Sequence, residues 1–306
     1  MNTAIREAYG KALLELKDNP DVVVLDADLA HATKTLAFSQ ECPEHFFNMG
    51  ISEADMIGTA AGLATCGKVP FATTFSVFAA GRAFDQIRNS VCYPNLNVKV
   101  VGTHAGITVG ADGGTHQAIE DIAIMRSLPN MSVIVPSDDV EARAAVLAAS
   151  ELKGPMYLRM SRVPTKTYHH DDYKFEFGKG EIVREGTDCT VIATGIMVEY
   201  ALEAAEKMAE DGVSVRVVNM PTIKPIDDEL VVKCARETGR IVTAEEANVI
   251  GGLGSAVCEV VAGTVPVPVK RVGVEDRFGR SGTPEELLEA YGLTAEHIED
   301  EIRSMM

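Results

Sequence analysis

The chain has 306 residues, a formal net charge of −17 and no long run of Lys or Arg, a balance that disfavours a nucleic-acid or anionic-membrane surface. The length suits about two domains, and 46% hydrophobic with 24% charged residues is ordinary for a soluble globular protein. No apolar run approaches the roughly 18 residues that a membrane-spanning helix needs.

The N-terminal residues and the cysteines both bear on localisation. The chain starts with an amphipathic helical pattern rather than the uninterrupted apolar stretch of a secretion signal. The six cysteines are scattered, without a Cys-x-x-Cys pair, so we expect free thiols in a reducing cytoplasm. The apolar residues of the helical pattern are Ile5, Tyr9, Leu13 and Leu16.

Residues 1–165 are predicted to form a first α/β domain, because short apolar runs alternate there with helical patterns. Strands that are apolar throughout and separated by helices are typical of parallel sheets covered on both faces. The expected strands are Val22–Leu25, Val69–Thr73, Val98–Gly102, Ser132–Val135 and Met156–Met160, and the expected helices are Glu53–Thr65, Val77–Val91, Gln117–Ser127 and Val140–Leu152.

Residues 166–180 are predicted to be a linker. The stretch Arg162–Gly180 is polar, contains scattered aromatic residues and has no sustained hydrophobic period. His169 and His170, followed by two Asp residues, suggest a metal site, but no further ligands are evident nearby. A solvated linker is the favoured interpretation.

Residues 181–306 are predicted to form a second α/β domain. A capping box at Thr283 and Glu286 marks one clear helix start. We therefore expect two consecutive α/β domains with mainly parallel sheets. The expected strands lie near Cys189–Thr194, Val213–Val218, Arg240–Ala244 and Val269–Val274, and the expected helices near Met197–Asp211, Asp227–Glu237, Leu253–Ala262, Pro284–Ala290 and Ala295–Met306.

The loop Thr103–Gln117 is the first candidate functional segment. It follows an apolar strand and carries four glycines together with His104, Asp112 and His116. Loops at the carboxyl ends of parallel strands are where α/β proteins bind ligands, and histidine often handles substrate protons near neutral pH. We therefore expect an active-site loop rather than a flexible solvated turn.

The roles of three further charged residues cannot be assigned from residue type alone. Glu53 begins a helix of small and apolar residues after Ser52, which is a suitable N-cap. Its carboxylate either stabilises the helix start through the helix dipole or is a buried functional acid. Arg159 and Arg162 end the last strand of the first domain, where a guanidinium either binds an anion or lies in solvent.

Five segments, in order along the chain, resemble the transketolase family. They are GISEADMIGTAAGLA (50–64), PFATTFSVFAAGRAFDQIR (70–88), THAGITVGADGGTHQ (103–117), the strand end Met160–Arg162 and GRSGTPEELLEAYGL (279–293). Each motif alone is modest, whereas five in family order over nearly the whole chain are highly specific. The resemblance covers the last two of the family's three domains, with the pyrimidine-binding domain at 1–165 and the C-terminal domain at 181–306.

The resemblance implies that the chain binds part of thiamine diphosphate. In enzymes of this type a Glu at the position of Glu53 hydrogen-bonds N1′ of the aminopyrimidine. That contact lets the ring's amino group become an imine, which takes the proton from the thiazolium carbon. Phe78 matches the aromatic residue that packs on the aminopyrimidine, and Phe75 belongs to the same pocket. Asp28 corresponds to a residue near the cofactor at the family's dimer contact.

The same resemblance implies substrate contacts. His104 and His116 correspond to histidines that contact the carbonyl and hydroxyls of the sugar. Asp112 matches an acid that reads a substrate hydroxyl, and Arg162 matches an arginine that binds the substrate phosphate.

One phosphate-binding position departs from the family pattern. A Ser that follows the Asp-Leu motif in many members is missing, so Thr33 or Lys34 would have to replace it. Arg82 offers a second replacement, because the related deoxyxylulose-phosphate synthases place an Arg in a comparable stretch.

The family's Gly-Asp-Gly motif, which holds Mg²⁺ and the diphosphate, is absent from the sequence; the nearest string is Ala111-Asp112-Gly113. The resemblance therefore implies half of a cofactor site, with Mg²⁺ held mainly by a partner. We expect that partner to be an N-terminal transketolase subunit, and this chain to form a homodimer within a heterotetramer.

The favoured function is that of the C-terminal subunit of a split transketolase, which moves a two-carbon ketol unit between sugar phosphates, as in the pentose phosphate pathway. The alternatives are the β subunit of a 2-oxo-acid dehydrogenase's decarboxylase component, a deoxyxylulose-phosphate synthase-like fragment and a catalytically silent scaffold subunit. The two histidines of the Gly-Ala-Asp-Gly loop favour sugar chemistry. The presence of Glu53, Arg162 and both histidines argues against a silent subunit.

Overall fold

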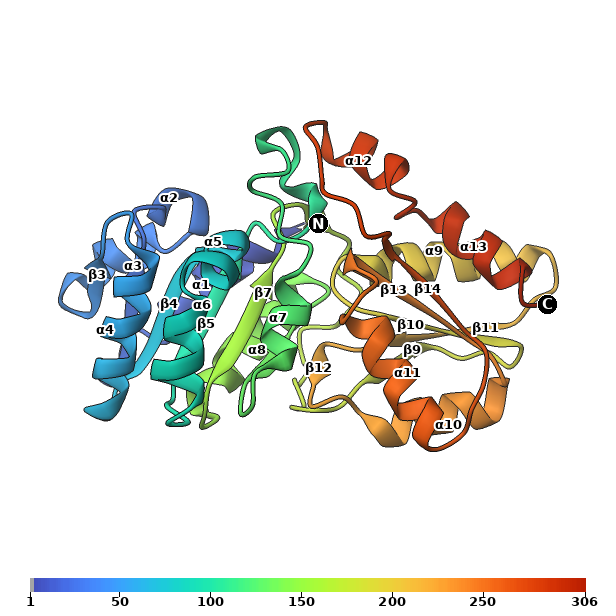
Figure 1. Ribbon diagram of the computed structural model, residues 1–306, viewed down its shortest axis with the longest axis horizontal. Helices are drawn as coiled ribbons and strands as arrows, with labels where there is room; N and C mark the ends of the chain where they lie inside the picture. Colours follow the sequence, from blue (N-terminus) through green and yellow to red (C-terminus); the bar gives the residue numbers. More distant parts are fainter. Residues whose placement is uncertain (1–2) are drawn as a thin grey trace.

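The first of two sheets has seven strands in the order β12-β6-β7-β5-β4-β2-β3. The computed structural model describes residues 3–306, and Figure 1 shows its two α/β bodies side by side. Neighbouring strands in this sheet are parallel, except that β12 comes from the second half of the chain and pairs antiparallel with β6. The strands are β2 Val22–Asp26, β3 Phe46–Asn48, β4 Val69–Phe75, β5 Lys99–Thr103, β6 Ser132–Ile134, β7 Met156–Met160 and β12 Thr222–Lys224.

Successive residues of these strands enter two different hydrophobic cores, one on each face of the sheet. In β2, Val22 and Val24 belong to the core that contains α1 and α8, whereas Val23 and Leu25 belong to the core that contains α4 and α5. Burial on both faces explains why the strand is apolar throughout. The helical segments are α1 Ile5–Glu15, α2 Ala30–Thr33, α3 Leu36–Glu41, η1 Pro43–His45, α4 Glu53–Thr65, α5 Ser76–Arg82, α6 Phe84–Gln86, η2 Ile87–Cys92, η3 Ile107–Asp112, α7 Asp121–Ser127 and α8 Asp139–Glu151.

The second sheet has the strand order β14-β13-β10-β11-β9, in which β9 is antiparallel to β11 and the other pairs are parallel. Helices α9 and α13 contribute to one core of this sheet, and α10 and α11 to the other. The capping box of Thr283 and Glu286 forms as expected, and the predicted fold class is confirmed. The elements are β9 Glu181–Arg184, β10 Cys189–Ala193, α9 Met197–Glu210, β11 Val215–Asn219, α10 Asp228–Thr238, β13 Ile241–Asn248, α11 Leu253–Gly263, β14 Val269–Val274, α12 Pro284–Ala290 and α13 Ala295–Arg303.

Two further observations concern the whole described chain. The six cysteines all lie within it, and all are free thiols. Between residues 3 and 306, no helix combines the length and the apolar character needed to cross a membrane.

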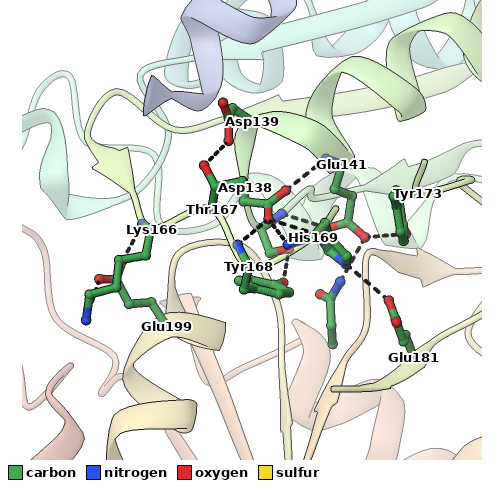
Figure 2. A network of polar contacts seen from close by, with 12 residues as sticks. Asp138, Asp139, Glu141, Lys166, Thr167, Tyr168, His169, Tyr173, Glu181 and Glu199 are labelled. Carbon is green, nitrogen blue, oxygen red and sulfur yellow. Dashed lines mark hydrogen bonds and ion pairs between the residues drawn. The ribbon is translucent and has the colours of Figure 1, made fainter. Parts of the chain in front are cut away.

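The segment between the two sheets is anchored at His169. The ring Nδ1 lies 3.0 Å from Asp138 Oδ2, and Nε2 lies 3.1 Å from Glu181 Oε2; Figure 2 shows both carboxylates beside the ring. Asp138 caps α8 of the first domain, and Glu181 begins β9 of the second. His169, which lies in the linker, therefore contacts both domains. The prediction of a solvated linker is therefore wrong at His169, although His170 is exposed. Within the described residues, no group of three His, Cys, Asp or Glu side chains is arranged to hold a metal ion.

The environment of His169 stabilises its protonated form. Burial by itself lowers the pKa of His169, but hydrogen bonds to Asp138 and Glu181 and the nearby Glu141 carboxylate outweigh burial and raise the pKa to about 9. Glu141 is itself fixed by the hydroxyl of Tyr173, which donates to it at 2.8 Å. Because the ordinary histidine pKa is about 6.5, the folded chain binds this proton more tightly than the unfolded chain.

This difference predicts a pH-dependent stability. The contribution of His169 to the free energy of unfolding should be complete below about pH 6.5 and lost as the pH rises through about 9. We expect His169→Gln to destabilise the chain by a few kcal/mol at about pH 6 and by much less at about pH 9.5. Urea unfolding at both pH values measures this. The matched control is His170→Gln at the exposed neighbour, and an equal loss for His169→Gln at both pH values would contradict a protonated His169.

Candidate active site

The candidate residues gather at one edge of the first sheet. Phe75 ends β4, His104 directly follows β5, Arg162 lies two residues after β7, and Asp28 lies two residues after β2. These strands are parallel to one another, so their carboxyl ends meet at the same edge, which is the usual ligand-binding edge of an α/β sheet.

Glu53 is a buried acid at the start of α4, which follows β3. Only 4% of its surface is exposed, and the neighbouring Met56 and Ile57 are fully buried. Its Oε1 accepts a hydrogen bond from Arg82 Nη1 at 3.0 Å. A buried carboxylate is costly unless it is paired, and Arg82 provides that pairing. Glu53 is therefore a buried, paired acid rather than a solvated charge at a helix start.

An aromatic cluster is linked to this carboxyl through Arg82. Phe75 and Phe78 are stacked, with ring centroids 5.7 Å apart and planes 13° from parallel. The ring of His104 lies 3.9 Å from that of Phe75, and the ring of His116 lies 5.4 Å from that of Phe78. The structure thus joins the two predicted pyrimidine-pocket aromatics and the two loop histidines into one continuous contact surface.

Arg82 bridges the acid and the aromatic cluster. Its guanidinium donates to Glu53 and also lies 3.9 Å above the centroid of the Phe78 ring, in a cation–π contact. The Arg82 side chain is 52% exposed, whereas that of Glu53 is 4% exposed. Arg82 therefore covers both groups from the solvent side.

His104 is held as a neutral imidazole. Burial, followed by the charges of Arg6, Arg162 and Lys34, lowers the pKa of His104 to about 3. Arg6 Nη1 lies 2.9 Å from Nε2 and can only donate, so Nε2 accepts and the ring proton is on Nδ1, 3.0 Å from Thr103 Oγ1. Three cations near one neutral ring make this region attractive to an anion.

Arg162 and Arg159 have different environments. Arg162 Nη1 lies 3.2 Å from Asp112 Oδ2, and both side chains are partly exposed at the loop. Arg159 is buried and its Nε donates to Asp121 at 2.8 Å. Arg162 is therefore the arginine of this strand end that a ligand can reach, whereas Arg159 is part of the core.

Asp28 and the segment after it lie at the same edge. Asp28 has a left-handed backbone, with φ of 62°, and accepts a hydrogen bond from Asn48 at 3.1 Å. Thr33 is fully buried, and its hydroxyl donates to Asp26 at 2.7 Å. The Thr33 hydroxyl is thus already engaged in this structure, whereas the side chains of Lys34 and Arg82 are partly exposed.

Sequence reasoning missed Arg6. This residue lies in the first turn of α1, where it reads as one charge on the polar side of an amphipathic helix. Its contact with His104 joins residues that are 98 positions apart. Nothing in the local sequence of α1 points to such a contact.

Two family models match the two halves of the chain. The transketolase pyrimidine-binding domain matches residues 1–166, and the transketolase C-terminal domain matches residues 178–298. A Methanocaldococcus jannaschii protein, named provisionally as a transketolase C-terminal section, is 50% identical over 306 residues, which cover 99% of this chain and 96% of that protein. A 6-deoxy-6-sulfo-D-fructose transketolase subunit of a Clostridium species is 46% identical over 295 residues, which cover 96% of this chain and 92% of that subunit.

A solved structure is also similar over nearly its full length. It is described as a split-gene transketolase in an inactive beta4 tetramer. It shares 55% sequence identity and a TM-score of 0.92 with this chain, covering 98% of this chain and 97% of its own. The chain therefore belongs to the transketolase family, of which it carries the pyrimidine-binding and C-terminal domains.

Proposed function

We propose that this chain is the C-terminal subunit of a split transketolase, which transfers a two-carbon ketol unit between sugar phosphates. The observation that carries the proposal is the contiguous surface at the sheet edge. There Arg82 links the buried Glu53 carboxyl to the ring of Phe78, which stacks on Phe75, and two histidines of the loop complete the cluster. An acid, an aromatic face and loop histidines are the groups that this chemistry requires.

The residues fit the aminopyrimidine half of thiamine diphosphate. Glu53 would hold N1′, and Phe78 would pack on the ring. When bound, thiamine diphosphate would supply a nucleophilic carbon for the sugar carbonyl. In this structure Arg82 occupies both positions, because it binds the Glu53 carboxyl and lies over the Phe78 ring. Its side chain would therefore have to adopt another rotamer when the pyrimidine binds.

The diphosphate half of the cofactor does not fit this chain. Mg²⁺ that binds a diphosphate is usually held by one or two carboxylates together with phosphate oxygens, and the Gly-Asp-Gly motif that holds it in the family is absent from this sequence. We assign those ligands to an N-terminal subunit that carries the Gly-Asp-Gly motif. The inactive beta4 tetramer of the split-gene relative supports the need for a second kind of chain. In the assembled enzyme, a heterotetramer in the cytoplasm, this chain would form a homodimer.

The substrate side is built from the loop and the cations around it. Arg162, Arg6 and Lys34 all act on the pKa of His104, so a sugar phosphate bound there would meet several positive charges. His116 and Asp112 stand on the same loop, in reach of the sugar hydroxyls. Arg82, beside the cluster, is a further candidate for the phosphate.

The experiment that tests the function is co-purification from the native source, followed by a two-carbon transfer assay with the pair of chains. We expect the partner to carry the Gly-Asp-Gly motif and the pair to transfer a ketol unit between sugar phosphates. A pair that decarboxylates 2-oxo acids instead would identify the chain as the β subunit of a 2-oxo-acid dehydrogenase component.

Arg162→Ala should discriminate between substrates. Loss of a charge-assisted contact with the phosphate is worth roughly 1.5–3 kcal/mol, on the order of ten- to a hundredfold in KM. We expect KM to rise by that factor for phosphorylated sugars and to change little for the unphosphorylated sugars, as measured by steady-state kinetics of the reconstituted enzyme. Equal losses on both types of sugar would mean that Arg162 does not bind the phosphate.

A further inference from the structure

The loop at residues 103–117 rests on the C-terminal domain. The amide of Thr108 donates a hydrogen bond to Glu246 Oε1 at 2.7 Å, and Gln117 Nε2 donates to the carbonyl of Arg280 at 2.9 Å. Figure 1 shows the loop beside the segment that leads into α12, and α12 packs against η3 within the loop. The loop that carries three candidate site residues is therefore held from the second domain.

Glu246 reaches the loop because Gly106 leaves room for its carboxyl. Gly106 has a φ of 73°, and a Cβ at this position would collide with the Glu246 carboxyl. Glu246 is only 2% exposed and stands on β13, between β10 and β14. Its Oε2 is buried without a hydrogen-bond partner among the described residues. Such a carboxyl costs stability compared with an apolar side chain, so its placement points to a role in holding the loop.

Glu245, the preceding residue of β13, is an internal comparison. Its carboxyl accepts hydrogen bonds at 2.8 Å from the amides of Leu253 and Gly254, where α11 begins. Burial raises the pKa of both Glu245 and Glu246 to about 7. The hydrogen bonds from backbone amides and the charge of Arg159 lower the pKa, but burial has the larger effect. Both residues are glutamates of the same strand and both are almost completely buried. Glu245 contacts the start of α11, whereas Glu246 contacts the loop.

We propose that Glu246 is a positioning residue for the transfer reaction. By holding the Thr108 amide, it fixes the loop backbone between His104 and Asp112 and so orients both toward the sugar. His104 has a left-handed φ of 53°, a conformation that persists in a non-glycine residue only where its surroundings restrain it. The C-terminal domain thereby acts on the substrate through the loop. This inference rests on the proposed function, in which the loop binds the sugar.

Hydrogen exchange on the full 306-residue chain tests the contact without any partner. In Glu246→Ala, exchange of the Thr108 amide and its neighbours should be about tenfold faster or more, because the amide loses a buried acceptor. Glu246→Gln keeps the shape and a neutral accepting oxygen, so its exchange should rise only a few-fold. Glu245→Ala should accelerate exchange at the start of α11 and leave the loop unchanged.

Two outcomes would overturn the positioning role. One is unchanged loop exchange in folded Glu246→Ala; the other is equal acceleration of the loop by Glu245→Ala. If Glu246→Ala does not fold, Glu246→Leu decides the matter, because it fills the same space without an accepting oxygen: its loop exchange must rise, and wild-type exchange in this variant refutes the contact.

Kinetics of the reconstituted enzyme provide the second arm. Glu246→Ala should lower kcat/KM for the sugars about tenfold and Glu246→Gln only a few-fold, while the affinity for thiamine diphosphate and proton exchange at its thiazolium carbon stay as in the wild type. Glu245→Gln should leave kcat/KM unchanged. If the wild-type pair of chains does not transfer a ketol unit, the proposed function is refuted, but the hydrogen-exchange result remains valid. If substitution of Glu246 does not change the exchange of the loop, the positioning role is refuted even in an active enzyme.

Discussion

Glu53→Gln should reduce two-carbon transfer by the reconstituted enzyme about a thousandfold or more while leaving the fold intact. The amide fills nearly the same volume, but it cannot exchange a proton with N1′ of the aminopyrimidine, and positioned acid–base groups contribute on the order of a hundred- to ten-thousandfold. Since Glu53 is buried and pairs with Arg82, the substitution also releases the Arg82 guanidinium from its carboxylate partner.

The direct measurement is hydrogen exchange at the thiazolium carbon of bound thiamine diphosphate, followed by NMR. We expect exchange to slow with Glu53→Gln to the same extent as turnover. Asp55→Asn is the matched control, because Asp55 is an exposed acid in the same first helical turn and shares any effect of the helix dipole. Exchange at the wild-type rate in Glu53→Gln would remove Glu53 from the catalytic assignment.

The elements with strong local patterns were predictable from the sequence. The strand Met156–Met160 and the helix Glu53–Thr65 have the expected bounds, because an apolar run and a small-residue helix are each defined by their own residues. The expected single helix Val77–Val91 is instead divided into α5, α6 and a π-helical segment, η2. Such a break depends on how the turns pack, and the helical period of the sequence continues through it.

Long-range pairing was beyond the sequence pattern. The strand β12 contains three residues and joins the sheet of the other domain, so its partner is set by tertiary contacts rather than by any local period. His169 shows the same limit, because a polar linker sequence hides a ring that is buried between two carboxylates.

The residues of the candidate site that belong to sequence motifs were predictable. Those that join the site through a single long-range contact were not. Glu53, Phe78 and the loop histidines stand in recognisable segments, and the structure brings them to one surface. The contacts of Arg6 with His104 and of Glu246 with Thr108 join residues 98 and 138 positions apart. Physical proximity of this kind comes from the arrangement of strands, which residue spacing does not encode.

The isolated chain should fold but should not transfer ketol units. Each sheet has helices on both faces and continuous apolar cores, and the thiols are free, so folding requires neither disulfides nor a metal.

Catalysis fails for a different reason, which concerns charge. In the proposed site, Glu53 and Phe78 would bind the pyrimidine. A diphosphate also needs its negative charge neutralised, and the sequence lacks the Gly-Asp-Gly motif that holds Mg²⁺ in the family. Calorimetry with thiamine diphosphate and Mg²⁺ should therefore show weak binding or none, and the transfer assay no turnover. Addition of a chain that carries the Gly-Asp-Gly motif should restore both cofactor binding and turnover, since that motif would supply the ligands for Mg²⁺ and the diphosphate. Robust turnover by the purified chain alone would contradict the split-enzyme proposal, because all the ligands for Mg²⁺ and the diphosphate would then have to come from these 306 residues.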